Sequence, residues 1–312
     1  MSREIKPGQS PTGLPLPRLA QMLLGKWAVL VAVVMEATAA FPSSLLIKNE
    51  DANITRNCFG SPGEQVEWKQ NGQTLEDSGG ELVINNLDIP YAGNYSCWAG
   101  PRLLQSFYVV MWLNHSYFFK AEGTKKEPTI TCWAPSYSGT LNCSWKSQNP
   151  ATFLVHLKHR DSEAELCSTE VALPRNRMVQ IQLNNCSFCS YAEEMPVTPL
   201  VLVLKGLSED GGGYNEVNKT FLLRDIVRPD APAYLNITGR KVSWAPPASW
   251  DLPTTYFPLQ YSLRLESASG SQENFLLAEK ELITEQNWYK AQIRCQDPLI
   301  NSSWSSWQEW KK

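Results

Sequence analysis

The chain has 312 residues, with 28 Lys and Arg against 31 Asp and Glu, so its formal net charge is −3. This balance and the lack of a basic block argue against a nucleic-acid partner, because binding to phosphates needs clustered positive charge. Hydrophobic residues make up 43% of the chain, which argues against a disordered protein, and the length predicts two or three domains.

Residues 1–40 are expected to be a secretory signal peptide. The apolar run Trp27–Met35 is followed by small residues that permit cleavage after Ala39 or Ala40. The run is much shorter than the roughly 20 residues that a membrane span needs. Initiation at Met22 would give the signal ordinary proportions. Since no later apolar run reaches membrane length, we expect a secreted, extracellular protein without a membrane span.

Residues 41–120 are expected to form an immunoglobulin-like sandwich. Cys58 is followed by Trp68, and Cys97 closes the pattern, with Tyr95 two residues before it. In this spacing a disulfide bridges two sheets beside a buried indole, and the tyrosine forms the corner that fixes the turn before its strand. A disulfide between Cys58 and Cys97 is therefore predicted.

Residues 121–228 are expected to form a second β-unit. Cys132 and Cys143 lie in two expected strands separated by turn-forming residues, so a disulfide between them would span a hairpin. Cys167 and Cys186 flank a further expected strand pair and are predicted to form a third disulfide.

Residues 229–312 are expected to form a third unit, separated from the second by Pro229 and Pro232, which interrupt strand pairing. In the expected strand Tyr289–Cys295, the odd-numbered residues are apolar and the even-numbered ones are polar. Alternate residues of a strand point to opposite faces, so the odd-numbered face is predicted to be buried. Cys295 is accordingly expected to be a buried free thiol.

Asn-x-Ser/Thr sequons recur along the chain, which predicts N-glycosylation in a secreted protein. The favoured acceptors are Asn53, Asn114, Asn218 and Asn236.

The segment Trp304–Gln308, with the sequence WSSWQ, resembles the WSxWS box of class I cytokine receptors, with Gln in place of the last Ser. In that family the tryptophan rings interleave with basic side chains of the neighbouring strand through cation–π contacts. By this resemblance, Trp304 and Trp307 would stack with Arg294, and Lys290 is a further candidate. We expect this ladder to support the fold rather than to contact a partner.

Together with the cysteines of the second unit, this box makes the chain similar to class I cytokine receptors, and within them to the beta subunits of interleukin-12-type cytokines. The resemblance implies an all-β fold, in which an immunoglobulin-like sandwich is followed by two fibronectin type III sandwiches. It implies a subunit that holds a four-helix-bundle alpha subunit at the elbow of its fibronectin domains. The pair would engage a cell-surface class I cytokine receptor chain on lymphocytes. A soluble alpha-type receptor, which captures a helical cytokine reversibly, has the same architecture and is the alternative.

Cys189 occupies, by this resemblance, the place of the cysteine that forms an interchain disulfide with the alpha subunit. The polar residues Ser190–Glu194 that follow it favour exposure, and an odd exposed cysteine in a secreted protein suggests intermolecular pairing. The alternatives are a C-x-x-C motif with Cys186 that acts in redox chemistry or metal binding, an internal bond from Cys189 to Cys167, and a homodimer through Cys189.

Tyr137, Glu193, Tyr256 and Asp297 match, by the same resemblance, the positions that contact the alpha subunit. A carboxylate there could accept a two-pronged contact from an arginine of the partner, while tyrosines exclude water. Asp297 is the leading candidate. The alternatives are ordinary turn packing for the tyrosines and a solvated turn carboxylate for Asp297. Leu299 stands where the family has an aromatic residue, so the surface is expected to be more apolar.

No enzymatic activity is expected from the sequence, and no metal or cofactor. The chain has only three histidines, and no nucleophile elbow, phosphate loop or zinc pattern accompanies them. His156 and His159 lie in an expected strand, which would place them on opposite faces.

Overall fold

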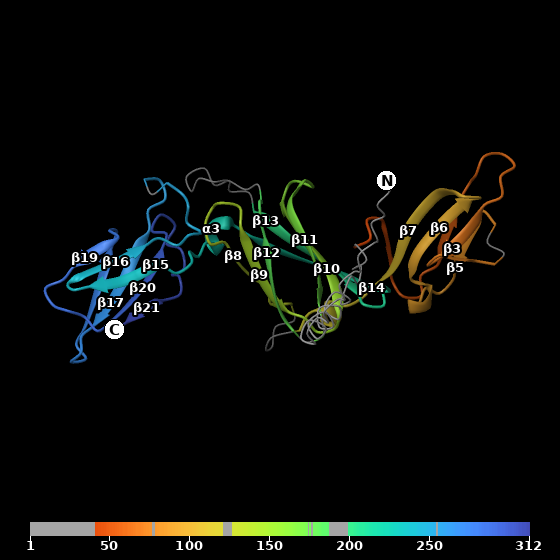
Figure 1. The fold of residues 1–312 in the computed structure, drawn as a ribbon. Coiled ribbons are helices and arrows are strands. Elements are labelled where there is room, and N and C mark those ends of the chain that lie inside the picture. Colours follow the sequence, from red (N-terminus) through yellow and green to blue (C-terminus); the bar gives the residue numbers. More distant parts are fainter. Residues whose placement is uncertain are drawn as a thin grey trace, which may run out of the picture. The chain divides into compact units, whose positions relative to one another are not determined.

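Figure 1 shows the computed structural model, which describes residues 41–76, 79–120, 127–173, 175, 177–186, 199–253 and 255–312. The predicted signal peptide, Cys189 and Glu193 lie outside the described residues. Helical structure in the described part is limited to three short segments: the 3-10 turn η1 (Ile89–Tyr91), α2 (His115–Phe118) and α3 (Leu223–Ile226). The rest of the regular structure consists of strands, so the predicted all-β fold is confirmed.

The immunoglobulin-like unit has two layers of strands. The larger layer contains β1 (Leu45–Lys48), β7 (Arg102–Trp112), β6 (Gly93–Ala99), β3 (Glu67–Gln70) and β4 (Gln73–Thr74), and the smaller one pairs β2 (Ile54–Asn57) with β5 (Glu81–Ile84). The Cys58–Cys97 disulfide joins the end of β2 to β6 across the layers, with 6.4 Å between the Cα atoms. Trp68 is fully buried next to it, and the Tyr95 hydroxyl donates a 2.7 Å hydrogen bond to the carbonyl of Tyr91. This is the tyrosine-corner arrangement expected from the spacing.

The second unit also has two layers, which enclose a buried aromatic core. One layer has the strand order β11 (Glu165–Leu173), β10 (Ala151–His159), β13 (Leu200–Ser208) and β14 (Gly213–Phe221), and the other has the order β12 (Met178–Leu183), β9 (Leu141–Lys146) and β8 (Thr131–Trp133). Buried and half-buried residues alternate along β9 and β10, as expected for strands with one face toward a core. The rings of Trp145 and Phe153 meet in this core at 5.5 Å between centroids.

A short parallel ladder joins the sheets of the first two units. β7 and β14 pair at Met111 with Gly213 and at Trp112 with Tyr214. The amide of Asn215 adds a 2.6 Å hydrogen bond to the carbonyl of Leu113. One nine-stranded sheet therefore passes across the predicted boundary at residue 120; the domain boundaries themselves stay predictions.

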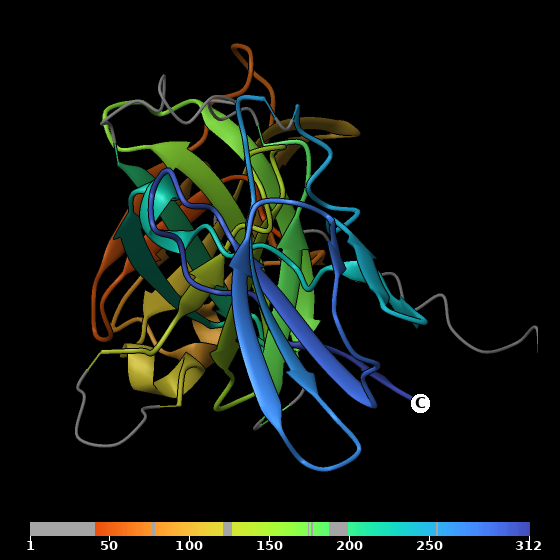
Figure 2. The ribbon, with the colours of Figure 1, turned by 90° about the vertical axis from the view of Figure 1, so that its left-hand side faces the viewer.

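The third unit has a three-stranded and a four-stranded layer (Figures 1 and 2, cyan to blue). The smaller layer has the order β15 (Ala233–Thr238), β16 (Lys241–Ala245) and β19 (Glu281–Ile283), and the larger one has the order β18 (Gln272–Leu277), β17 (Gln260–Glu266), β20 (Lys290–Gln296) and β21 (Gln308–Lys311). Ala291, Ile293 and Cys295 are fully buried, as the alternation predicted. Tyr289 is an exception at 38% exposure, because β20 begins only at Lys290 and the Tyr289 ring instead packs under the ammonium of Lys311.

Candidate functional site

The buried pair Tyr137–Asp297 links two loops far apart in the chain. Tyr137 lies between β8 and β9, and Asp297 directly follows β20. The Tyr137 hydroxyl donates a 2.7 Å hydrogen bond to Oδ2 of Asp297, and both residues are fully buried. The other carboxylate oxygen accepts a 2.8 Å hydrogen bond from the backbone N–H of Leu299. Both oxygens of Asp297 are thus used inside the protein.

Aromatic side chains surround the Tyr137 ring. Its centroid lies 5.8 Å from that of Trp250 and 5.3 Å from that of Phe257, and the Trp250 indole donates a 3.1 Å hydrogen bond to the carbonyl of Phe257. Burial, together with the hydrogen bond to Asp297, raises the pKa of Tyr137 far above its usual value. The hydroxyl therefore stays protonated and remains a donor to Asp297 at all physiological pH values.

Tyr137 and Asp297 are both fully buried, so the alternative interpretation of Asp297 as a solvated turn carboxylate does not hold. Tyr137 reaches the Asp297 carboxylate from within the protein, so no carboxylate oxygen is presented outward. Direct contact of this pair with a partner stays a prediction, and it would require a rearrangement of the pair.

Two exposed side chains adjoin, in sequence, residues of this buried cluster: Tyr256 is next to Phe257, whose ring packs on Tyr137, and Leu299 is near Asp297. Tyr256, which precedes Phe257, is 57% exposed, and Leu299, which follows Asp297 by two residues, is 53% exposed. The backbone N–H of Tyr256 donates a 3.0 Å hydrogen bond to the carbonyl of Pro253, and that of Leu299 is held by Asp297. Both side chains are therefore carried by loops with fixed backbones. We refer to Tyr256 and Leu299 as the elbow surface.

Six cysteines form three disulfides in the structure: Cys58–Cys97, Cys132–Cys143 and Cys167–Cys186. Cys295 is the free cysteine of the described residues, and it is buried. Its thiol donates to the carbonyl of Asp230 at 3.4 Å, and burial raises the pKa of the thiol to about 12. Cys189, the predicted interchain cysteine, and Glu193, the predicted alpha-subunit contact, lie outside the described residues.

The tryptophans of the WSSWQ segment stack with arginines of the neighbouring strands. The guanidinium carbon of Arg294 lies 4.7 Å from the ring centroid of Trp304 and 4.5 Å from that of Trp307. Arg264 adds a third contact, 5.1 Å from the Trp307 ring. The sequence reasoning missed Arg264, although it lies on β17, which pairs directly with β20 and thereby places a second cation next to the box.

Lys290, the further candidate for the ladder, takes no part in it. Its ammonium lies 3.9 Å from a carboxylate oxygen of Glu309 on β21. Lys290 and Glu309 are near each other because β20 and β21 pair antiparallel with Lys290 opposite Lys311, so the lysine lies away from Trp304 and beside the last strand.

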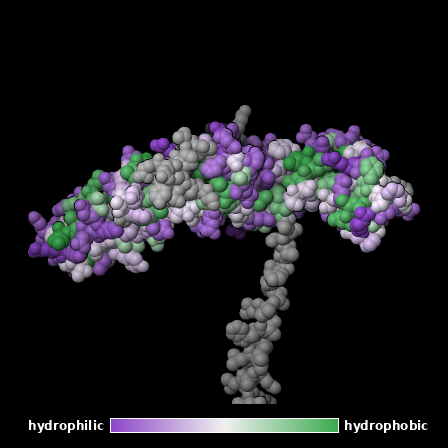
Figure 3. Space-filling view, turned by 90° about the horizontal axis from the view of Figure 1, so that it is seen from above, coloured by the Kyte–Doolittle hydropathy of each residue, from purple (hydrophilic) through white to green (hydrophobic). Residues whose placement is uncertain are grey.

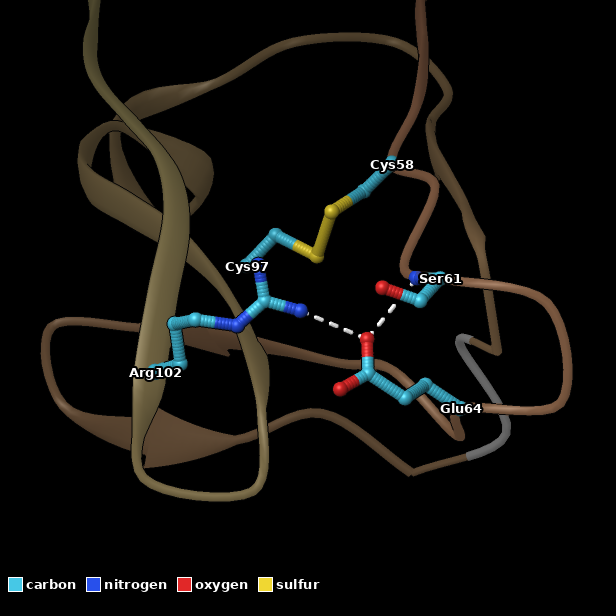
Figure 4. Close-up of polar contacts among 5 residues, drawn as sticks. All are labelled: Cys58, Ser61, Glu64, Cys97 and Arg102. Atoms are coloured by element: carbon cyan, nitrogen blue, oxygen red, sulfur yellow. Dashed lines mark hydrogen bonds and ion pairs between the residues drawn. A yellow bond between two sulfur atoms is a disulfide. The ribbon is translucent and has the colours of Figure 1, made fainter.

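The loop after Cys58 is tied to the start of β7 by one carboxylate. Glu64 accepts hydrogen bonds from the backbone N–H of Ser61 at 2.8 Å and from the guanidinium of Arg102 at 2.6 Å (Figure 4). The hydrogen bond from Ser61 is the main cause that lowers the pKa of Glu64, and Arg102 adds to it. Phe59 is 83% exposed at this end of the sandwich. Sequence reasoning did not identify this loop as a candidate surface.

The four favoured sequon asparagines, Asn53, Asn114, Asn218 and Asn236, are all exposed. Two of them already accept hydrogen bonds through the side-chain oxygen. Asn53 accepts one from the N–H of Asn86 at 3.0 Å, and Asn114 caps α2 by accepting one from the N–H of Ser116 at 3.0 Å.

The described ranges contain no group of three or more His, Cys, Asp or Glu side chains placed to hold a metal ion. None of the helices in these ranges has the length and apolar character that crossing a bilayer requires. On the face seen in Figure 3, hydrophobic residues lie in patches among hydrophilic ones.

The immunoglobulin-like sandwich, the two following sandwiches and the arginine–tryptophan ladder together resemble the architecture of class I cytokine-receptor-like proteins. A family model described as the C-terminus of the cytokine interleukin-12p40 matches residues 127–205. The chain is 27% identical over 282 residues to interleukin-12 subunit beta of Marmota monax, covering 81% of this chain and 84% of that protein. The human subunit is 26% identical over 284 residues, with the same coverage. The resemblance to interleukin-12 beta subunits is thereby confirmed.

A receptor is also among the similar proteins. The ciliary neurotrophic factor receptor subunit alpha of Gallus gallus is 26% identical over 266 residues, which cover 80% of this chain and 66% of that receptor. The chain is thus similar in sequence both to a cytokine subunit and to a cytokine receptor subunit.

Proposed function

We propose that this chain is the secreted beta subunit of a heterodimeric interleukin-12-type cytokine. It holds a four-helix-bundle alpha subunit at the elbow of its fibronectin-type units, and the pair engages a class I cytokine receptor chain on lymphocytes. The observation that carries the proposal is the elbow surface, in which Tyr256 and Leu299 are exposed. The backbone N–H of Leu299 is held by the buried Asp297 of the Tyr137–Asp297 pair, and that of Tyr256 is held by the carbonyl of Pro253.

Such a surface suits a helical partner for a physical reason. A tyrosine and a leucine held on fixed loops lose little conformational entropy on binding, so their buried apolar area contributes more fully to affinity. Helical cytokines present apolar ridges that can cover such side chains and exclude water around them. Asp297 then acts as a positioning residue, because its carboxylate orders the loop that carries Leu299.

Substitution on the elbow surface tests this role. We expect Tyr256→Ala together with Leu299→Ala to reduce the amount of alpha subunit recovered with the chain at least tenfold, in line with the loss of two central contacts. Leu276→Ala is the matched control, because Leu276 is similarly exposed but lies on β18. Equal recovery with the double variant and the control would contradict the proposed site.

The proposed covalent link between the subunits runs through Cys189. Mass spectrometry of the unreduced secreted protein, from cells that naturally make it, would identify what is attached to this cysteine. A disulfide to a helical cytokine chain is the expected result. A Cys189–Cys189 bond would indicate a homodimer instead, and an internal bond or a small-thiol adduct would favour the alternative below.

The proposed receptor contact lies on the immunoglobulin-like unit. Phe59 is presented by the loop that Glu64 ties to Arg102, and Leu103 is exposed next to Arg102 on β7. An exposed aromatic ring on a loop of fixed shape is typical of interface centres. We expect Phe59→Ser to weaken receptor binding and to leave alpha-subunit recovery unchanged.

A soluble alpha-type receptor that captures a helical cytokine reversibly is the second candidate. Similarity to the ciliary neurotrophic factor receptor subunit alpha favours it. The same elbow surface would serve both functions, so the covalent state of Cys189 separates them.

A further inference from the structure

Tyr234 combines a strained backbone with an exposed ring. Its φ angle is 54°, in the left-handed region, where a bulky side chain is unfavourable and Asn or Gly is preferred. Its side chain is 86% exposed. The strain has a local origin, because the β15–β16 register shifts between Ala233 and Asn236, so that Tyr234 and Leu235 together oppose Trp244. Such a bulge redirects a side chain, here toward solvent.

The outward face of β15 carries this ring and a complete sequon. Tyr234, Asn236 and Thr238 are exposed, whereas Leu235 between them is buried. The Asn236 amide donates a 3.3 Å hydrogen bond to the Thr238 hydroxyl, so the two sequon side chains lie on the same side of the strand. Tyr234 and Asn236 are two residues apart, and both are exposed although the bulge lies between Ala233 and Asn236.

We propose that the N-linked glycan of Asn236 packs on the ring of Tyr234, which serves as a platform for the first N-acetylglucosamine. The transfer forms a bond from Asn236 Nδ2 to C1 of the sugar and breaks the C1–O bond to a lipid pyrophosphate donor, which departs as the leaving group with the amide proton going to solvent. The C–H-bearing face of the sugar then covers the aromatic face through dispersion. Attachment two residues away supplies the sugar at high effective concentration.

The neighbouring sequons lack this arrangement. At Asn218 the residue two positions earlier is Glu216, a carboxylate. At Asn114 it is Trp112, but that ring already packs on Tyr214 at 5.9 Å between centroids, and the Asn114 side chain caps α2. Asn218 therefore provides a control glycan.

The inference uses one element of the proposed function, passage through the secretory compartment, and is independent of the alpha subunit and the receptor. If no alpha subunit were found attached to Cys189, the proposed function would fail but this inference would still stand. Conversely, a secreted chain with Asn236 unoccupied would overturn this inference and leave the proposed function standing.

A double-mutant cycle on the full-length secreted chain tests the contact. Asn236→Gln removes the glycan, and Tyr234→Asn removes the ring while keeping a residue that tolerates the positive φ angle, so folding is preserved; it creates no new sequon. Hydrogen exchange of the β15 and β16 amides reports local opening. We expect the glycan to slow this exchange about three- to tenfold with Tyr234 present and in the ring-preserving Tyr234→Phe background. In the Tyr234→Asn background we expect the glycan to have no effect.

Two further readouts separate a ring contact from a general effect of glycosylation. Trimming to a single N-acetylglucosamine should retain the protection, and the acetyl methyl protons of that sugar should shift upfield through the Tyr234 ring current. The Asn218→Gln variant should show no coupling to Tyr234. Equal protection by the Asn236 glycan with and without the ring, or an acetyl methyl signal that does not respond to Tyr234→Asn, would overturn the proposal.

Discussion

The hydroxyl of Tyr137 donates a 2.7 Å hydrogen bond to the Asp297 carboxylate, 160 residues away in the chain, and both groups are fully buried. Tyr137→Phe would leave a buried carboxylate oxygen without its donor. Hydrogen bonds to charged groups contribute about 1.5–3 kcal/mol, so the free energy of unfolding should fall by about that amount. Urea denaturation followed by Trp fluorescence measures it. Tyr256→Phe, at an exposed site, is the control and should change stability little.

Each arginine of the arginine–tryptophan ladder should contribute to the stability of the fold in proportion to the number of tryptophan rings that it contacts. Arg294 contacts two rings and Arg264 one. We expect Arg294→Ala to lower stability by about 1–2 kcal/mol and Arg264→Ala by about 0.5–1 kcal/mol, with secreted yield falling in the same order. Lys290→Ala removes only a surface pair with Glu309 and should change stability by less than about 1 kcal/mol. The reverse order of the two arginine variants would contradict the ladder.

The loop that carries Phe59 should loosen on acidification. The hydrogen bond from Ser61 and the charge of Arg102 lower the pKa of Glu64 in the folded protein. A lowered pKa means that the stabilisation is present above the ordinary value of 4.5 and is lost as the pH falls through the folded-state pKa. Hydrogen exchange of the Ser61 amide should therefore rise at low pH beyond the intrinsic pH effect. Glu64→Gln should remove this dependence, while Glu67→Gln should retain it.

The Cys295 thiol should be unreactive in the native protein. Burial raises its pKa to about 12, so almost no thiolate is present at neutral pH and reagents cannot reach it. A raised pKa also means that its contribution to stability is complete below the ordinary value of 9.0 and is lost between that value and about 12. We expect alkylation of Cys295 by iodoacetamide only after unfolding. Rapid labelling under native conditions would refute the buried thiol.

Local sequence patterns were sufficient to predict which residues form the cores of the sandwiches. The Cys58–Trp68–Cys97 spacing specifies a disulfide beside a buried indole, and the structure has both. The alternation in the strand that ends at Cys295 predicted its buried face correctly except at Tyr289, where the strand has not yet begun. Strand ends are set by turn geometry and by pairing with distant strands, which alternation within one segment does not contain.

Contacts between distant segments could not be predicted in the same way. A resemblance indicated Tyr137 and Asp297 as neighbours of a partner, but their mutual hydrogen bond depends on how two loops approach across 160 positions. Arg264 was missed for a similar reason, because its place in the ladder follows from the pairing of β17 with β20. The strain at Tyr234 arises from a one-residue register shift, which composition and periodicity do not reveal.

The parallel pairing of β7 with β14 has a consequence for shortened versions of the protein. A fragment that begins after Leu113 would keep both fibronectin-type sandwiches but would lose the segment that pairs with one end of β14. The carbonyls of Gly212 and Tyr214, which accept hydrogen bonds from the N–H groups of Met111 and Leu113, would then lie at an open sheet edge, and open edges recruit strands from other molecules. Such a fragment should self-associate with increasing concentration, so the immunoglobulin-like unit also protects its neighbour from aggregation.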